Sequence, residues 1–266
     1  MIDYGFTVVH IPHASVNIPG KYHKTIVLNE KRLWREMARM TDAFCDELYD
    51  APEFQKRVVA PVSRLVCDVE RFRDDRLEPC AKKGQGLLYV RTVYGRRLRN
   101  YDEELRNDVL REIYDPHHAK LTAAVEEALA RYGKCLIIDG HSFDSKMILK
   151  PDNKLSFPLL FPEFDIGTDP YHTPAALCDA VCGRVRELGF RPKVNTPFGG
   201  AITPMKYYQR DKRVVSIMFE ANRKLYMNEK NMTKSAGFQK TREACHALMQ
   251  FAAEYVNNMQ TGELKS

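Results

Sequence analysis

Lys134-Cys-Leu-Ile-Ile-Asp-Gly-His-Ser142 is the stretch of sequence that decides the fold. Its apolar, partly β-branched residues run up to Asp139 and then give way to polar residues of catalytic type. This pattern predicts a buried strand that ends beside a functional site. The same pattern recurs at residues 6–10, 57–61 and 213–220. We therefore expect strands at these four places.

Helical periodicity lies between the expected strands. The apolar residues of the first predicted helix recur at spacings of three and four: Leu33, Met37, Met40, Phe44 and Leu48. Asn29 is placed to cap its start. A second helical region covers residues 101–131. Pro116 interrupts it, because proline lacks the helical N–H donor, so we expect two helices or one kinked helix.

Two further helices follow toward the C-terminus. Thr173 and Pro174 supply a cap and a first-turn proline for one of them, and Gly189 supplies its stop. The last helix is expected over residues 234–255, with a frayed tail at residues 260–266.

Strands that alternate with helices predict an α/β fold whose largely parallel sheet is covered on both faces. Ligands of such sheets bind beyond the carboxyl ends of the strands. The length of 266 residues fits one domain over residues 1–266, with a long loop at residues 151–170.

Composition narrows the functional classes. No apolar run of membrane-spanning length and no signal-peptide pattern occurs, so we expect a cytoplasmic protein without membrane contact. The seven scattered cysteines predict reduced thiols rather than disulfides. The net charge of +6 is spread along the chain, which favours a small anionic substrate over nucleic acid. The oligomeric state is left open.

Histidine and carboxylate side chains of metal-binding type follow the expected strands. They are His13, His141, Asp68, Glu70 and Glu220. Each taken singly also fits a loop, core or ion-pair residue. Together at strand ends they favour a zinc or other divalent-metal site with an open position, which is the equipment needed to hydrolyse an amide.

Seven motifs resemble, in order, the landmarks of the N-formylglutamate amidohydrolase family. They are Pro12-His-Ala-Ser15, Asp68-Val-Glu-Arg71, Tyr114-Asp-Pro-His-His118, Asp139-Gly-His-Ser142, Asp165-Ile-Gly-Thr168, Asn195-Thr-Pro-Phe-Gly-Gly200 and Phe219-Glu-Ala-Asn-Arg-Lys-Leu-Tyr-Met227. The resemblance covers nearly the whole chain, and its most specific part is the stretch from Asp165 to Met227.

The resemblance implies a three-layer α/β/α sandwich with a central mixed, largely parallel sheet of the phosphorylase/hydrolase-like kind. It implies hydrolysis of N-formylglutamate to formate and glutamate. It also implies zinc held by His13, a carboxylate and His141, with Glu220 as general base. Either Asp68 or Glu70 is the intervening carboxylate, and Glu70 is our first choice.

Substrate contacts are also implied by the resemblance. Arg71 matches an arginine that binds the substrate carboxylate in related enzymes, a role that suits a bidentate guanidinium. Asn195 and Arg223 are further substrate-binding candidates, because a small polar substrate needs several fixed hydrogen bonds. Turn formation for Asn195 and salt bridging for Arg223 are alternatives of equal weight.

Two positions depart from the family pattern. The chain has Ala14-Ser15 where the family usually has Ser-Gly, and Glu70 where the family usually has asparagine. The added carboxylate of Glu70 would repel an anionic substrate unless a metal ion or Arg71 neutralises it. Either Glu70 is a metal ligand, or the substrate is not formylglutamate; both are compatible.

Weaker signals leave alternatives open. His118 is either a residue that supports a ligand or an interior histidine. Ser142 is expected to be a hydrogen-bond partner rather than a nucleophile, because it lacks a nucleophile-elbow pattern. The arginine-rich segment at residues 91–99 is interpreted as an anion-binding lid or a solvated surface.

Two competing functions remain at this point. The first keeps the fold and makes the protein a zinc amidase or peptidase that cleaves a peptide-like substrate. The second is a non-catalytic protein with a degenerate site, which binds an anion or nucleic acid through its basic surface.

Overall fold

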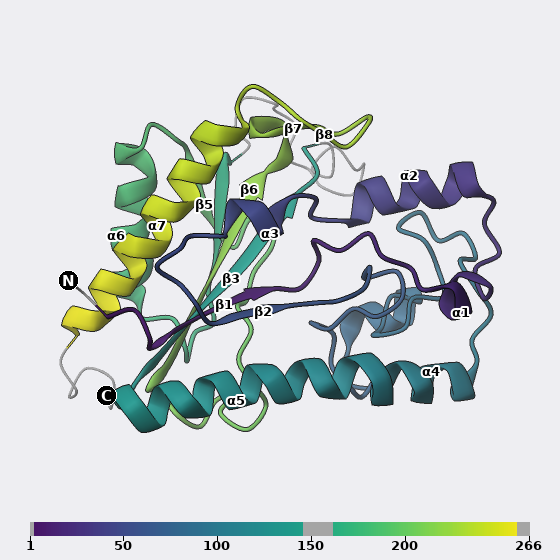
Figure 1. Ribbon diagram of the computed structural model, residues 1–266, viewed down its shortest axis with the longest axis horizontal. Coiled ribbons are helices and arrows are strands. Elements are labelled where there is room, and N and C mark those ends of the chain that lie inside the picture. Colours follow the sequence, from purple (N-terminus) through teal and green to yellow (C-terminus); the bar gives the residue numbers. More distant parts are fainter. Residues whose placement is uncertain (1–2, 146–161, 260–266) are drawn as a thin grey trace.

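A central sheet with helices on both faces makes up most of the computed structural model, which describes residues 3–145 and 162–259 (Figure 1). The sheet contains β1 (Thr7–Ile11), β2 (Arg57–Val59), β3 (Cys135–Phe143), β4 (Phe164–Gly167), β5 (Pro192–Val194) and β6 (Val214–Asn222). The helices are α1 (Gly20–His23), α2 (Glu30–Met40), α3 (Cys45–Leu48), α4 (Glu103–Val109), α5 (Asp115–Tyr132), α6 (Ala175–Glu187) and α7 (Phe238–Asn258). The short strands β7 (Met227–Asn228) and β8 (Thr233–Lys234) pair with each other, and 3₁₀ turns lie at Pro79–Lys83 and Arg223–Leu225.

The strands of the central sheet follow the order β2-β1-β3-β6-β4-β5. β1 is parallel to β2 and β3, and β3 is parallel to β6. β4 is antiparallel to β6, while β5 is parallel to β4. The sheet is therefore mixed and largely parallel, which confirms the fold class expected from the sequence, and all four expected strands are present.

β4 and β5 were not expected. β4 lies inside the stretch predicted to be a long loop, so that prediction is wrong for Phe164–Gly167; residues 151–161 lie outside the described part of the chain. A four-residue strand with Asp165 and Gly167 carries little periodic signal, and it forms by pairing with β6. β5 begins at Pro192, which an edge strand tolerates because one side of its backbone has no strand partner.

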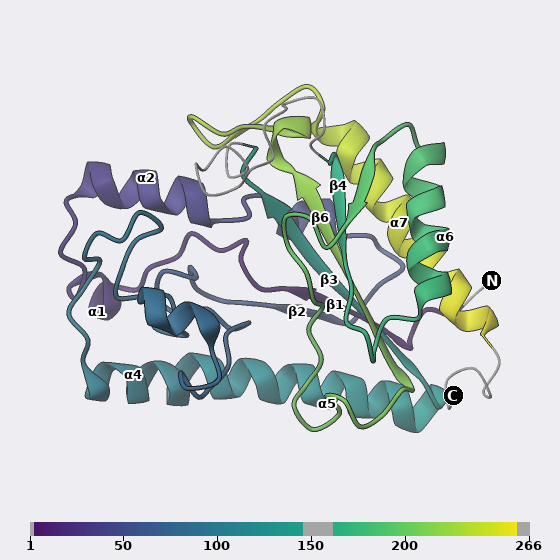
Figure 2. The same ribbon diagram turned by 180° about the vertical axis from the view of Figure 1, so that it is seen from behind.

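Alternate residues of the buried strands enter two different cores. Val9 and Leu136 belong to the largest apolar cluster, which includes residues of α3, α6 and α7. Val8 and Ile137, their chain neighbours, pack instead with Leu121 of α5. Figures 1 and 2 show α5 on the opposite side of the sheet from α6 and α7. The predicted covering of both faces is thereby confirmed.

The first helix is shorter than its apolar pattern predicts. Asn29 caps α2 as expected, and its side chain accepts a hydrogen bond from the N–H of Arg32 at 3.0 Å. The helix ends at Met40, because Thr41 is extended, and Phe44 adopts a left-handed conformation with φ of 67° before α3 begins. The prediction of one continuous helix to Leu48 is therefore wrong.

The second helical region continues through its proline. α4 passes into a π-helical turn at Leu110–Tyr114, which passes directly into α5. Pro116 lies in the first turn of α5, directly after the π turn, in which the N–H of Asp115 bonds to the carbonyl of Leu110. The expected interruption is thus limited to a π turn. Figure 1 shows α4 and α5 as one continuous helix along its lower edge.

The two C-terminal helices agree with the sequence in position but not in capping. α6 begins after Pro174, yet the hydroxyl of Thr173 donates to the carbonyl of Ser216 at 2.6 Å instead of capping the helix. Gly189 has φ of 83° just beyond the helix end, as its predicted role requires. α7 begins at Phe238 rather than at residue 234, and residues 260–266 lie outside the described part.

A second group of segments extends from the carboxyl-terminal edge of the sheet. It contains α1, α2, α4 and the loops between them, on the right of Figure 1 and the left of Figure 2. These segments have apolar clusters of their own, in which Val66, Val69 and Leu87 pack against Leu110 and Ile113. This second group forms a wall beside the strand ends.

Two further expectations are tested by the structure. All seven cysteines are free, and all except the partly buried Cys80 are buried, as expected. Within residues 3–145 and 162–259, no helix combines the length and apolar character that a membrane crossing requires.

Candidate metal centre and active site

Five ionisable side chains occupy one face of the sheet near its carboxyl-terminal edge. Asp139 and His141 are two residues apart in β3 and so point to the same face. The register pairs His10 with Asp139, and pairs Glu220 with both His141 and Asp165. Residues paired directly across strands share a face. The strands alone therefore assemble a continuous polar patch.

Loops bring two more groups to this patch. His13 lies just beyond β1, where its carbonyl accepts the N–H of Asp42 at 2.9 Å. Glu70 comes from the segment after β2; its Oε1 lies 3.1 Å from His141 Nε2 and its Oε2 lies 3.6 Å from His13 Nε2. The potential ligand atoms of His13, Glu70 and His141 all lie within 4.8 Å of one another. The structure thus brings together the three residues predicted to hold the metal.

Asp68 also reaches His13 but is occupied by other partners. Its Oδ1 lies 2.9 Å from His13 Nε2. Its Oδ2 accepts hydrogen bonds from Arg64 Nη2 at 2.7 Å and from Tyr89 OH at 2.6 Å. Burial raises the pKa of Asp68, but Arg64 and His13 together hold it well below its usual range. Asp68 is thus an ionised, neutralised carboxylate, whereas Glu70 has no guanidinium partner among the salt bridges of the described residues.

Asp42 lies behind both histidines. Its Oδ2 is 3.1 Å from His141 Nδ1 and 3.6 Å from His13 Nδ1, and its Oδ1 accepts from Arg223 Nη2 at 2.8 Å. Burial opposes ionisation, yet contacts with the histidines and the charge of Arg223 hold the pKa of Asp42 below its usual range. A carboxylate that binds Nδ1 leaves Nε2 free to face a metal ion, so Asp42 orients the imidazole of His141.

Arg223 and Ser142 form a buried support around Asp42. Besides Asp42, Arg223 donates to the carbonyls of Arg39 and Ser142, and its Nε donates to Ser142 Oγ. Tyr226 OH donates to the same Ser142 Oγ at 2.8 Å. These contacts agree with the expected hydrogen-bonding role of Ser142. They favour the salt-bridging alternative for Arg223, whose substrate role stays a prediction.

A chain of buried hydrogen bonds runs from α5 to the site. His117 of α5 and His10 of β1 face each other with their Nε2 atoms 2.9 Å apart. His10 Nδ1 lies 2.7 Å from Asp139 Oδ1, which is in turn 3.1 Å from His141 Nε2. Burial and the neighbouring His10 lower the pKa of His117 to about 2, so this imidazole is neutral.

Glu220 is buried in the patch, and its Oε2 has no hydrogen-bond partner. Burial raises the pKa of Glu220 well above its usual range; Asp42 and Asp165 add to the rise, while His141 and Arg223 oppose it. A buried carboxyl group with a raised pKa and an unpaired oxygen is a candidate for proton transfer.

Asp165 borders Glu220 on the neighbouring strand. It accepts the N–H groups of Thr196 and Phe198 at 2.8 and 2.9 Å. Burial outweighs these hydrogen bonds and raises the pKa of Asp165 to about 6. The residue therefore fixes the turn that follows β5 against the sheet.

Arg71 and His118 lie close to the residues that could hold a metal ion. Arg71 Nε is 3.4 Å from Asp68 Oδ2, and its side chain is 26% exposed, so part of the guanidinium faces outward. This position is compatible with its predicted substrate role. His118 Nε2 contacts the carbonyl of Val69 at 2.8 Å and so holds the segment that carries Glu70. His118 thus supports a ligand-bearing loop.

Asn195 is engaged in a local turn. Its φ of 51° is left-handed, its Oδ1 accepts from the N–H of Thr168 at 2.9 Å, and its Nδ2 donates to Thr168 Oγ1 at 2.8 Å. These contacts favour the turn-forming alternative. The substrate role of Asn195 stays a prediction.

The donor set fits a divalent cation. Among the salt bridges of the described residues, guanidinium groups reach Asp42 and Asp68 but not Glu70 or Asp139, whose ion-pair partners are imidazoles. Asp139 also accepts the N–H of Ile202 at 3.1 Å. Although burial disfavours a charged imidazole, Glu70 and Asp139 raise the pKa of His141 well above its usual range. Two carboxylates without a permanent cation, beside imidazole nitrogens, form a set that zinc binds through nitrogen and oxygen.

Sequence reasoning missed several members of the site. Asp42 was hidden because the apolar pattern ran past it as though through a helix. Arg64, Tyr89 and His10 carried no spacing signal. His117 belongs to the Tyr114–His118 motif but was not singled out within it. The alternation of β3 gave one clue, since Asp139 and His141 had to share a face once the strand was recognised.

Three comparisons with known proteins bear on this site. The family model for N-formylglutamate amidohydrolases matches residues 6–227. An N-formylglutamate deformylase from Pseudomonas aeruginosa is 29% identical over 204 residues, which cover 71% of this chain and 71% of that protein.

Two solved structures share the fold. The crystal structure of N-formylglutamate amidohydrolase from Ralstonia eutropha superposes with a TM-score of 0.81 at 23% identity, covering 95% of this chain and 94% of that one. A gene product from Agrobacterium tumefaciens superposes with a TM-score of 0.65 at 20% identity, covering 94% and 92%. The same layered arrangement therefore persists in structures with low sequence identity to this chain.

Proposed function

The chain belongs to the N-formylglutamate amidohydrolase family, and we propose from this premise that it hydrolyses the amide bond of N-formylglutamate to formate and glutamate. The observation that carries the proposal is the convergence of His13, Glu70 and His141 beside the buried carboxyl group of Glu220. This arrangement combines a cation site with a proton-transfer group.

His13, Glu70 and His141 would hold the metal, which we propose to be zinc. A bound divalent cation supplies a Lewis acid that polarises the amide carbonyl. Glu70 is favoured over Asp68 as the carboxylate, because Asp68 is already paired with Arg64 and Tyr89. Asp42 keeps the Nδ1 side of His141 occupied and its Nε2 directed at the site.

Glu220 is the proposed general base. It would take a proton from the attacking water and deliver it to the leaving nitrogen, so that formate departs and the amino group of glutamate is restored. A raised pKa lets Glu220 hold the proton between the two transfers, and a bound cation would favour the ionised form that must first accept it.

Arg71 is the proposed contact for a carboxylate of the substrate. Its guanidinium shares Asp68 but remains partly exposed. Metal binding by Glu70 would neutralise the carboxylate that otherwise repels an anionic substrate, so the departure from the family pattern is compatible with formylglutamate as substrate.

The test is formate release from N-formylglutamate, compared with N-acetylglutamate, N-formylaspartate and a short peptide. We expect turnover of N-formylglutamate above the others, its loss after chelation, and its return with zinc. Preferred cleavage of the peptide would contradict the substrate, and full activity after verified metal removal would contradict the metal.

Glu220→Gln tests the mechanism within the same assay. We expect kcat to fall by between about 100- and 10,000-fold, because the proton carrier is removed, while metal content is unchanged. Thr233→Ser, on the exposed β8 strand, serves as the matched control. A Glu220→Gln enzyme with normal kcat would exclude Glu220 as the base.

A further inference from the structure

A cavity of about 300 Å³ lies between α2 and the arginine-rich segment, apart from the metal ligands. Its lining contains four arginines and one glutamate, together with Leu28, Thr92 and Tyr94: Arg32, Arg35, Arg39, Arg96 and Glu36. None of these residues belongs to the proposed catalytic cluster. The surplus of positive charge makes the cavity attractive to anions.

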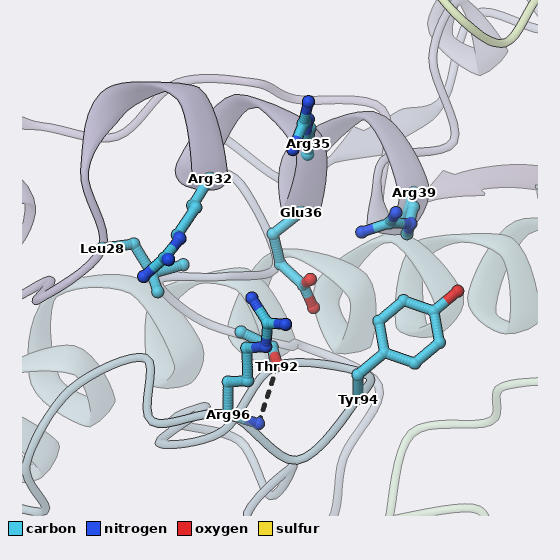
Figure 3. A pocket seen from close by; sticks show the side chains of 8 residues that line it. All are labelled: Leu28, Arg32, Arg35, Glu36, Arg39, Thr92, Tyr94 and Arg96. Carbon is cyan, nitrogen blue, oxygen red and sulfur yellow. Dashed lines mark hydrogen bonds between the residues drawn. The ribbon is translucent and has the colours of Figure 1, made fainter.

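Two elements position the guanidinium groups. Arg32 and Arg39 are seven residues apart on α2, which separates their backbones by roughly 10 Å. Arg96 comes from the opposite side, on a tight turn in which Gly95 has φ of 75° and the Arg96 N–H donates to Thr92 Oγ1 at 3.0 Å. Figure 3 shows Arg32 extending down from the helix near Leu28, and Arg39 near the other end of the helix, above Tyr94. Arg96 rises from its turn between them, toward Glu36.

Local contacts connect the two walls of the cavity, α2 and the turn that carries Arg96. The buried Glu36 accepts the N–H of Val93 at 2.6 Å, which ties the turn to the helix. The guanidinium of Arg39 lies over the ring of Tyr94, 4.9 Å from its centroid. Among the salt bridges of residues 3–145 and 162–259, none involves Arg32, Arg39 or Arg96. Their charges therefore remain available to a ligand.

The central carboxylate of Glu36 restricts the ligand. In Figure 3 it points into the space between the arginines, so a single compact anion at the centre would meet it directly. Anionic groups placed on either side, near Arg32 and near Arg39 and Arg96, avoid that repulsion and gain forked guanidinium contacts.

We propose that this cleft is a second ligand-binding site, which takes a small polyanion with at least two separated phosphate or carboxylate groups. It is independent of the proposed catalytic function. It also gives the arginine-rich segment a role as one wall of a binding site.

The experiment is calorimetric titration of the metal-loaded protein with orthophosphate, pyrophosphate, tripolyphosphate and citrate at fixed ionic strength. We expect the affinity to rise from orthophosphate to tripolyphosphate, since separated charges reach both groups of arginines. Citrate tests whether carboxylates substitute for phosphates.

Two double variants distinguish binding in the cleft from nonspecific attraction to positive charge. Arg32→Gln with Arg96→Gln should weaken tripolyphosphate binding at least about tenfold, because two forked contacts are lost. Lys31→Gln with Arg97→Gln removes the same charge from the same helix and turn, but neither residue lines the cavity, so binding should change less than about twofold. Metal chelation by the probe would affect both doubles equally. Thermal unfolding checks that both fold.

Three outcomes would overturn the proposal. The first is no binding of any polyanion to the wild-type protein. The second is equal weakening in both doubles, which would mean nonspecific attraction. The third is tighter, cleft-dependent binding of a single-stranded oligonucleotide than of tripolyphosphate, which would assign the surface to nucleic acid. Formate release serves as the separate readout for the catalytic site.

Discussion

The two halves of the candidate metal centre are built differently. His141, Asp139 and Glu220 lie on β3 and β6, where strand register alone fixes them on one face. His13 and Glu70 lie on loops, and their positions depend on Asp42, His118 and other residues distant in the chain. Strand register thus positions one half of the site, whereas the loop residues of the other half are positioned by additional tertiary contacts.

The largest expected effects distinguish the roles of Glu70 and Asp68, two carboxylates of the same loop. Glu70→Gln should weaken metal binding by more than about 100-fold, because it removes a proposed ligand. It should change stability less than Asp68→Asn does, because the ion-pair partners of Glu70 are the imidazoles of the site rather than a buried guanidinium. Asp68→Asn should instead lower the free energy of unfolding by about 3 kcal/mol, since it leaves the charge of Arg64 buried without its partner. Metal titration and urea unfolding of both variants measure this contrast. The reverse result would make Asp68 the ligand.

The next test concerns the group that joins the two halves. Asp42→Asn should lower metal affinity by about 10- to 100-fold, because the amide no longer fixes the imidazole of His141 as a carboxylate does. Asp46→Asn, on α3, is the control, and its metal affinity should equal that of the wild type. Unchanged affinity in Asp42→Asn would show that the strand alone orients His141.

The smallest expected effect concerns Asp165 on β4 and the dependence of stability on pH. The pKa of Asp165 is about 6 in the folded protein, above the ordinary aspartate value of 3.8. The folded state therefore keeps a proton that the unfolded state has lost, so this group costs stability as pH rises from about 4 to 6. The free energy of unfolding of Asp165→Asn, relative to that of the wild type, should therefore rise by on the order of 2 kcal/mol between pH 4 and 6. A loss of stability from the altered hydrogen bonds would shift this difference equally at every pH. Urea unfolding at several pH values measures the difference, and parallel curves would contradict it.

The contrast between strand residues and loop residues also explains which features could be predicted from the sequence. β1, β3 and β6 were predictable because long apolar runs leave few alternatives to a buried strand. His13, His141 and Glu220 follow from those strands by position. Asp42 did not, because helix periodicity continued through Phe44 and Leu48 although the backbone leaves the helix at Thr41. β4 was missed because its pairing with β6 comes from distant sequence.

The choice between Asp68 and Glu70 also required spatial information. The two residues differ little in sequence context, and only the location of Arg64 and Tyr89 distinguishes the occupied carboxylate from the available one. The turn of Asn195 and the buried contacts of Arg223 were likewise open alternatives, because tertiary partners decide whether a polar side chain faces a ligand or the protein.

The paired imidazoles beneath the site have a mechanical consequence. An ionised Asp139 only accepts hydrogen bonds, so His10 donates to it from Nδ1. The second hydrogen bond of His10 joins its Nε2 to Nε2 of His117, which belongs to α5. A displacement of this helix along the His117 direction would therefore be transmitted through two buried rings to Asp139, which lies 3.1 Å from His141.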